Sequence, residues 1–393
     1  MDRLTTFAGA RVRPLSLLGQ WEALGRPLRM LGKVPALIAL LLALAALGYS
    51  AVSTQHFDQV KQARAADLAK KRAAGRQGDL ALYQRINARV AAGENYYTVA
   101  TDEQRRNHYP TRPFVTVRTP TMALSAAVLG MRGWHWLGLI LLAGTAGAWL
   151  SKLWDRTLAL EKAAVFGLVI AAGWHATLPL IGLKHDIVAG LLLSLAFALH
   201  RPDRWWPSWI AVALALAVRE LAFPFVLVWA MVTLVDRRWG EFRAVLALIV
   251  LFVVGYTLHA WAVQAAQLPN DPMSPGWTER LGLPLVWGSL ADVTPMRPWP
   301  AWLTGPLALL PLLGWLGLGG RTGLFGLLYY GGMTVAIAIF ARANTFYWVM
   351  VMLPAYFVGL ALAPRALADL ALAVLGRPAR QRWGLVGQRL SEV

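Results

Sequence analysis

The sequence predicts an all-α membrane protein, a polytopic helical bundle of about ten transmembrane helices. Two observations predict this class, the composition and the recurring apolar runs. Of the 393 residues, 57% are hydrophobic and only 15% are charged, and the mean hydropathy is +0.49. Long apolar runs recur along the chain, and a run of about 20 residues is enough for a helix to cross the bilayer. Cysteine is absent, which excludes disulfides, thiolate metal ligands and a thiol nucleophile.

The apolar runs predict ten spans. In chain order they cover residues 34–52, 134–151, 162–182, 186–200, 207–219, 221–235, 241–263, 301–319, 322–341 and 344–363. Residues 119–130 form a shorter run, interpreted as an interfacial or re-entrant helix, and whether 119–131 spans the membrane is left open. Residues 59–90 place charged and small apolar residues at helical spacing, so helices along the outer surface are expected there.

Lysine and arginine residues set the expected orientation. They gather in one set of loops, at 26–33, 152–162, 201–204, 237–243 and 321, and again in the C-terminal tail. The positive-inside rule predicts that these loops and both termini are cytoplasmic. The net charge of +18 is then explained by orientation in the membrane and by contact with anionic lipid. Binding to nucleic acid is not expected. The alanine-, leucine- and arginine-rich composition favours a bacterial inner membrane, with the active site facing the periplasm.

The chain divides into four predicted parts. They are a basic interfacial segment (1–33), a catalytic transmembrane module (34–240) with outer loop 53–133, a C-terminal module (241–363) with outer loop 264–300, and a basic cytoplasmic tail (364–393).

Polar residues at the outer ends of the predicted spans are candidate functional residues, because ionisable groups at membrane depth are costly. Glu94, followed by Tyr96 and Tyr97, lies in the first outer loop. The predicted topology brings further polar residues to the same face: Arg112, Arg118, His185, Asp186, Arg219, Glu220, Arg342, Asn344 and Tyr347. Plain structural roles also fit, since tyrosines anchor at interfaces and a charge pair suits a tight turn.

These residues resemble motifs of the GT-C superfamily of integral-membrane glycosyltransferases, which includes protein O-mannosyltransferases and aminoarabinose transferases. Glu94-Asn95-Tyr96-Tyr97 resembles the acidic element of the first outer loop, and Arg118-Thr119-Pro120-Thr121 resembles a degenerate second motif. Asp186 in His185-Asp186 is similar to the acidic residue with which a later span of the family begins at the outer face. Arg219 is similar to the basic residue at the outer end of the helix after next. The family acid usually lies nearer to the first span, so Asp58 is a rival to Glu94. The adjacent Asp-Glu pair of the O-mannosyltransferases is missing.

The resemblance implies an inverting transferase that moves a sugar from a polyprenyl-phosphate-linked donor to a hydroxyl of a glycan, lipid or protein acceptor. Glu94 is the expected general base, with Asp58 and Asp186 as further catalytic candidates. Arginines are expected to hold the leaving phosphate: Arg219, Arg342, Arg112 and Arg118. Substrate contacts are expected from Tyr96, Tyr97, His185, Glu220, Asn344 and Tyr347.

No cofactor is expected, and membrane lipids are the other expected partners. A divalent metal bound by Glu94, Asp102, His185 and Asp186 is compatible with their chemistry, although their spacing forms no compact ligand motif. The alternative function is a transporter or flippase of a lipid-linked or anionic substrate, and a non-catalytic scaffold is a third hypothesis. The lack of repeated halves favours the enzyme. The sequence determines neither the sugar, the acceptor nor the oligomeric state.

Overall fold

The computed structural model describes residues 17–73 and 78–376. Within these ranges the protein is all-helical and has no named β-strand, so the predicted all-α class is confirmed. The α-helices are α1 (Leu17–Ala23), α2 (Lys33–Ala73), α3 (Asp79–Ala91), α4 (Tyr96–Arg106), α5 (Thr121–Leu153), α6 (Ala159–Ala172), α7 (His185–Leu199), α8 (Trp206–Val218), α9 (Phe223–Val235), α10 (Trp239–Ala266), α11 (Gly282–Asp292), α12 (Ala301–Leu318), α13 (Gly320–Phe340) and α14 (Val358–Val374). The 3-10 helices are η1 (Pro27–Met30), η2 (Phe114–Thr116), η3 (Trp154–Arg156), η4 (Trp174–Thr177), η5 (Ile181–Leu183), η6 (Glu220–Ala222), η7 (Ala343–Met352) and η8 (Ala355–Phe357).

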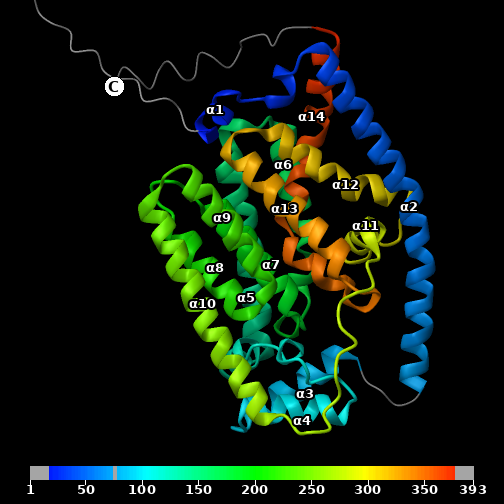
Figure 1. The fold of residues 1–393 in the computed structure, drawn as a ribbon, viewed down its shortest axis with the longest axis vertical. Helices are drawn as coiled ribbons and strands as arrows, with labels where there is room; N and C mark the ends of the chain where they lie inside the picture. The colour runs from blue at the N-terminus through cyan, green and yellow to red at the C-terminus, as the bar shows by residue number, and fades with distance from the viewer. Residues whose placement is uncertain (1–16, 74–77, 377–393) are drawn as a thin grey trace, which may run out of the picture.

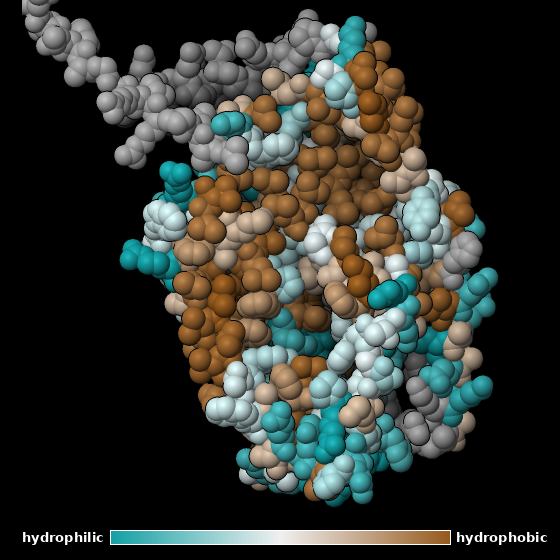
Figure 2. Space-filling view, in the orientation of Figure 1, coloured by the Kyte–Doolittle hydropathy of each residue, from teal (hydrophilic) through white to brown (hydrophobic). Residues whose placement is uncertain are grey.

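Six segments of the described chain are long and apolar enough to cross a membrane. They are Lys33–Asp67, Phe114–Arg156, Trp239–Ala266, Ala301–Leu318, Gly320–Phe340 and Ala355–Val374. Figure 2 shows hydrophobic surface over the flanks of the bundle and hydrophilic surface around α3 and α4 at its lower end. The chain therefore has the long apolar helices of a multi-pass membrane protein, while the predicted count of ten is not confirmed.

The first predicted span is the beginning of a much longer helix. α2 starts at Lys33 and continues to Ala73, as one rod along the side of the bundle (Figure 1). Residues 53–73 contain neither glycine nor proline and are rich in alanine, lysine and arginine, which favour helix. The helices expected over residues 59–90 are thus the end of α2 and the separate helix α3.

Several predicted spans are short or interrupted in the structure. The run 162–182 is divided into α6 and two 3-10 turns, η4 and η5. Helices α7, α8 and α9 have 13 to 15 residues, about 20 Å at 1.5 Å per residue, which is less than the ~30 Å hydrocarbon core. α8 and α9 each carry a proline in the first turn, at Pro207 and Pro224, where a missing N–H is tolerated.

The expected position of the last span is wrong. The sequence predicts a span over 344–363 and a tail from 364, but residues 343–352 form the 3-10 helix η7 and the helix α14 covers 358–374. Pro354, which has no N–H to donate, separates the two. Asp369 of α14 is buried and accepts hydrogen bonds from Arg26 at 2.8 Å, which holds the end of α14 against the N-terminal segment.

The run at 119–130 is a distinct piece of helix. Within α5 the backbone at Gly130 has φ 63° and ψ 174°, so the residues before it and after it form two helical pieces. A positive φ is accessible to glycine without a steric penalty. The expected boundary near residue 130 is confirmed, and the interfacial location stays a prediction.

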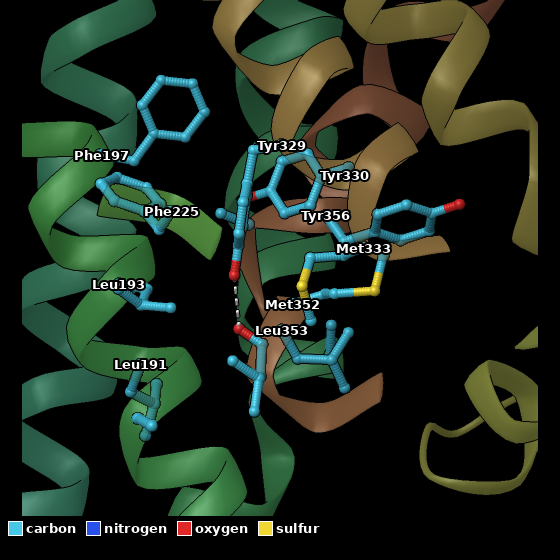
Figure 3. Close-up of a cluster of buried hydrophobic side chains, with 14 of the residues drawn as sticks. Leu191, Leu193, Phe197, Phe225, Tyr329, Tyr330, Met333, Met352, Leu353 and Tyr356 are labelled. Carbon is cyan, nitrogen blue, oxygen red and sulfur yellow. Dashed lines mark hydrogen bonds between the residues drawn. The ribbon is translucent and has the colours of Figure 1, made fainter. Parts of the chain in front are cut away.

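One hydrophobic core joins the two predicted transmembrane modules, whose division stays a prediction. Figure 3 shows Phe197 and Phe225 facing Tyr329 and Tyr330 across its centre. The Tyr329 hydroxyl donates to the Val351 carbonyl at 3.5 Å. Most buried apolar residues of α5, α7, α8, α9, α12, α13 and α14 belong to this single cluster.

The loops that the positive-inside rule groups together also meet in space. Glu22 accepts from Arg156 at 3.4 Å and from the backbone N–H of Arg321 at 2.6 Å, and Arg321 pairs with Asp236 at 2.7 Å. Glu161 pairs with Arg365 at 3.4 Å. These contacts join α1, η3, α6, α13, α14 and the α9–α10 turn at one end of the bundle, away from α3 and α4 (Figure 1).

Candidate functional site

Four charged residues meet at the ends of the short helices, and we call Arg118, Asp186, Arg219 and Glu220 the ion cluster. Asp186 lies in the first turn of α7, where a carboxylate suits the helix dipole. Arg219 caps α8 with an extended backbone, and Glu220 begins η6 directly after it. Arg118 precedes α5. Three separate segments of the chain thus supply the cluster.

Arg219 is at the centre of the ion cluster. Its side chain is 1% exposed. Its Nε donates to Asp186 Oδ1 at 2.8 Å and its Nη1 donates to Glu220 Oε1 at 2.5 Å. The remaining nitrogen, Nη2, is buried and has no hydrogen-bond partner within the described residues. A buried guanidinium therefore keeps one donor group unused.

Arg118 lies near the same Glu220 oxygen as Arg219. Its Nη1 lies 4.0 Å from Glu220 Oε1. Its Nε donates to the Tyr83 hydroxyl at 3.2 Å and its Nη2 donates to the Tyr347 hydroxyl at 3.3 Å. Two guanidinium groups therefore lie within 4.0 Å of one Glu220 oxygen.

Glu220 has the most exposed side chain of the ion cluster. It is 25% exposed, against 13% for Arg118 and 11% for Asp186. In the face shown by Figure 2, a hollow with hydrophilic surface on its floor opens between hydrophobic flanks, above the α3–α4 end. A charged molecule approaching the ion cluster would meet Glu220 and Arg118 first.

Tyr83 is a site residue that the sequence reasoning missed. It comes from α3 and its ring packs on His185, with 4.8 Å between the ring centroids. Burial raises the pKa of the Tyr83 phenol, so it stays neutral beside Arg118. The available signal was weak, because α3 shows only the spacing of Leu82, Ile86 and Val90 on its buried face. Nothing in the sequence ties Tyr83 to a distant arginine.

Glu94 belongs to a different set of charges. Both of its carboxylate oxygens accept from Arg89, at 2.9 and 2.6 Å, and Arg89 also pairs with Asp102 and Glu103 at 2.6 and 3.0 Å. Glu94 is exposed, and the hydrogen bonds from Arg89 lower the pKa of its carboxyl group. We call this set the α3–α4 network. The structure thus pairs Glu94 with Arg89, and no ion pair of the described residues joins it to the ion cluster.

The tyrosines after Glu94 connect α4 with the rest of the site. The Tyr96 hydroxyl donates to the backbone carbonyl of Arg118 at 2.6 Å, so Tyr96 supports the segment that carries this arginine. The Tyr97 hydroxyl lies 3.4 Å from His259 Nδ1 of α10. His185 contributes its ring to the packing around Tyr83.

The other predicted site residues lie outside the ion cluster. Arg112 donates to the Leu268 carbonyl at 2.8 Å, and the guanidinium of Arg342 lies 5.6 Å from the centre of the Trp277 ring. Asp58 and Asn344 are exposed. Across residues 17–73 and 78–376, no ion pair joins Arg112, Arg342 or Asp58 to a member of the ion cluster. Of the four predicted phosphate ligands, Arg118 and Arg219 are brought together.

The predicted metal ligands are divided between the two charge sets. Glu94 and Asp102 bond to Arg89, whereas Asp186 bonds to Arg219. In the part of the chain that the structure describes, no three histidine, aspartate or glutamate side chains are grouped as metal ligands.

No protein-family model, no curated protein and no solved structure matches this chain. The long apolar helices are those of a multi-pass helical membrane protein, and its ion cluster at the helix ends is centred on the buried Arg219.

Proposed function

We propose that the protein is a membrane glycosyltransferase that moves a sugar from a polyprenyl-phosphate donor to an acceptor hydroxyl, and that the ion cluster receives the donor phosphate. The observation that carries the proposal is the pair of guanidinium groups, of Arg118 and Arg219, that both lie within 4.0 Å of the Glu220 carboxylate. In the proposed orientation this end of the bundle faces the periplasm, and both termini are cytoplasmic in a bacterial inner membrane.

Two arginines suit a phosphate because each planar guanidinium can offer two parallel N–H donors to its oxygens. Arg219 Nη2 is such a donor and is unused. Arg118 is held by the hydroxyls of Tyr83 and Tyr347, which leaves its charge directed toward Glu220. The exposed apolar side chains of α10, such as Val250 and Leu251, offer hydrophobic surface on which a polyprenyl chain can lie.

The charge balance of the cluster gives Glu220 a role in the reaction. Two arginines and two carboxylates sum to zero, so an entering phosphodiester adds one negative charge. When the bond to the sugar breaks, the leaving phosphate gains a second negative charge, and transfer of the acceptor proton removes the charge of a neighbouring carboxylate. The acceptor oxygen forms its bond to the anomeric carbon, the bond from that carbon to the phosphate oxygen breaks, and its electron pair stays on the phosphate. The acceptor proton passes to Glu220, and attack opposite the leaving phosphate inverts the anomeric centre.

This proposal assigns the base differently from the sequence motif. Asp186 is the one of the three predicted catalytic acids that bonds to a predicted phosphate ligand, Arg219, which also donates to Glu220. Glu220 is the more exposed of the two carboxylates and lies within 4.0 Å of both arginines, so an acceptor hydroxyl reaches it more readily. Glu94 and Asp58 keep their predicted roles as rival bases.

The test uses the full chain in nanodiscs with labelled polyprenyl-phosphate mannose, glucose or arabinose in turn. Release of the sugar to water or to an acceptor measures the reaction. Glu220→Gln should lower this rate by about 100-fold or more, as expected for loss of a general base. Asp203→Asn, an exposed acid on the α7–α8 turn, is the matched control.

A binding experiment tests the phosphate site without depending on which sugar the donor carries. Polyprenyl phosphate alone should bind the wild-type chain and bind Arg118→Gln at least tenfold more weakly. Equal binding by both would remove the ion cluster from the proposal. Movement of the intact donor across liposomes, without cleavage, would establish the transporter instead.

A further inference from the structure

A second site lies at the opposite end of the bundle from the ion cluster. It is a cavity of about 400 Å³. The helix α7 connects the two places, because Asp186 stands in its first turn and His200, which lines the cavity, follows its last residue. At about 1.5 Å per residue the two ends of this helix are about 20 Å apart. The cavity therefore cannot be part of the ion cluster.

The floor of the cavity is aromatic with one polar group. Phe197, Phe225 and Trp229 line it and are buried in the core. Ser208, at the start of α8, also lines it and is 1% exposed. Its hydroxyl has no hydrogen-bond partner within the described residues. A buried hydroxyl without a partner is costly, and a bound molecule would satisfy it.

Two cations and one acid at the mouth of the cavity form no ion pair within the described residues, so these three side chains leave a net positive charge. Lys152 donates to the His200 carbonyl at 2.7 Å, and the described chain contains no ion pair between Lys152 and a carboxylate. Arg201 is exposed at the mouth and likewise pairs with no described acid. The acid left at the mouth without an ion pair is Asp155.

Three further lining arginines are already neutralised. Arg156 pairs with Glu22, Arg238 with Glu241, and Arg321 with Asp236. They fix the walls, whereas Lys152 and Arg201 are available to a ligand. The positive charge available to a ligand is therefore that of Lys152 and Arg201.

We propose that this cavity binds a phosphate-bearing molecule, with the phosphate between Lys152 and Arg201. The group attached to the phosphate then lies over the aromatic floor and bonds to the Ser208 hydroxyl. The volume suits a phosphate with a small attached group, because ligand pockets of this kind measure about 300–1,000 Å³. Two sources supply this chemistry, the headgroup of an anionic lipid in the adjacent leaflet and a soluble phosphate ester. The proposal does not depend on the glycosyltransferase proposal.

The experiment measures binding of two probes to the full chain in detergent. Native mass spectrometry compares phosphatidylglycerol with phosphatidylcholine of the same acyl chains, and equilibrium dialysis measures glycerol 3-phosphate. The double variant Lys152→Gln/Arg201→Gln should weaken binding of the recognised probe by about tenfold or more. Lys162→Gln/Arg204→Gln is the matched control, because it removes the same charge from the same end without touching the cavity.

Two more variants separate binding from folding. Arg201→Gln alone changes an exposed side chain and should weaken binding with an unchanged melting temperature. Ser208→Leu fills the floor and should reduce binding without altering charge. Selective loss of phosphatidylglycerol assigns a lipid headgroup, and selective loss of glycerol 3-phosphate assigns a soluble ester. No preference for either probe over phosphatidylcholine, or an equal loss in the control double variant, overturns the proposal.

Discussion

Arg219 and Asp186, 33 positions apart in the sequence, form a buried charge pair with 2.8 Å between Nε and Oδ1. The pair ties the end of α8 to the beginning of α7. Its burial makes Arg219 both a structural element and a candidate phosphate ligand, and the two roles respond differently to substitution.

Arg219→Ala should destabilise the protein instead of leaving it folded but inactive. Removing one partner of a buried ion pair leaves the other charge unpaired, at a cost of about 3–5 kcal/mol. The melting temperature in detergent should fall accordingly. The double variant Arg219→Met/Asp186→Leu should recover most of the loss, since both charges are gone. A double variant that is stable but binds no polyprenyl phosphate would separate the ligand role from the structural one.

Glu94→Gln should have little effect on transfer if the base lies in the ion cluster. Glu94 is exposed and already bonded through both oxygens to Arg89, which lowers its pKa and weakens it as a base. The rate of sugar release is measured beside that of Glu220→Gln. Should Glu94→Gln lose activity and Glu220→Gln keep it, Glu94 is restored as the base.

The loop after α10 should loosen in acid. Asp271 accepts from Arg105 at 2.5 and 3.0 Å and from Thr111 at 2.9 Å, and the hydrogen bonds from Arg105 lower the pKa of Asp271 to about 2. A carboxyl group with a lowered folded pKa stabilises fully above its unfolded value of about 3.9. That contribution is lost as the pH falls from about 4 to about 2.

Thermal unfolding between pH 6 and pH 2.5 measures this effect. Asp271→Asn should be less stable at pH 6 and should show a shallower fall in melting temperature below pH 4. Asp203→Asn, which has no ion pair with any residue in 17–73 or 78–376, should follow the wild type. Parallel curves for Asp271→Asn and wild type would contradict the assignment.

Gly314→Ala should destabilise the contact between α12 and α14. A Cβ at Gly314 would overlap the carbonyl oxygen of Gly359, a backbone atom that cannot rotate away. Overpacking of this kind costs about 1–3 kcal/mol or more. Gly331→Ala in α13 is the control, because a Cβ there meets no atom within 4 Å. Alanine should even stabilise that helix by up to about 1 kcal/mol. Equal melting temperatures for the two variants would show that the helices can separate.

The long uniform helices could be predicted from the sequence almost to the residue. The spans expected at 241–263, 301–319 and 322–341 correspond to α10, α12 and α13. Each has a continuous apolar run of spanning length, and this signal is local. The span expected at 344–363 was misplaced, because apolar residues in η7 are indistinguishable by composition from those in a membrane helix.

The candidate site could be predicted only in part. The grouping of Arg118, Asp186, Arg219 and Glu220 follows from a topology that gathers charges at one face, and the structure brings them into contact. The partner of Glu94 could not be chosen in this way, because Arg89 and Arg219 both lie on the predicted outer side. Arg89 is five positions from Glu94 in the sequence, and the structure pairs these two neighbours.

By itself the sequence determined that this is an apolar helical membrane protein and which loops share an end of the bundle, since hydropathy and charge are properties of single residues and short windows. Tertiary structure alone decided which acid meets which arginine, that Tyr83 supports Arg118, and that Ser208 lines a basic cavity. These depend on side chains from distant helices arriving within about 3 Å of each other. Only the packing of α3, α5, α7 and α8 fixes such distances.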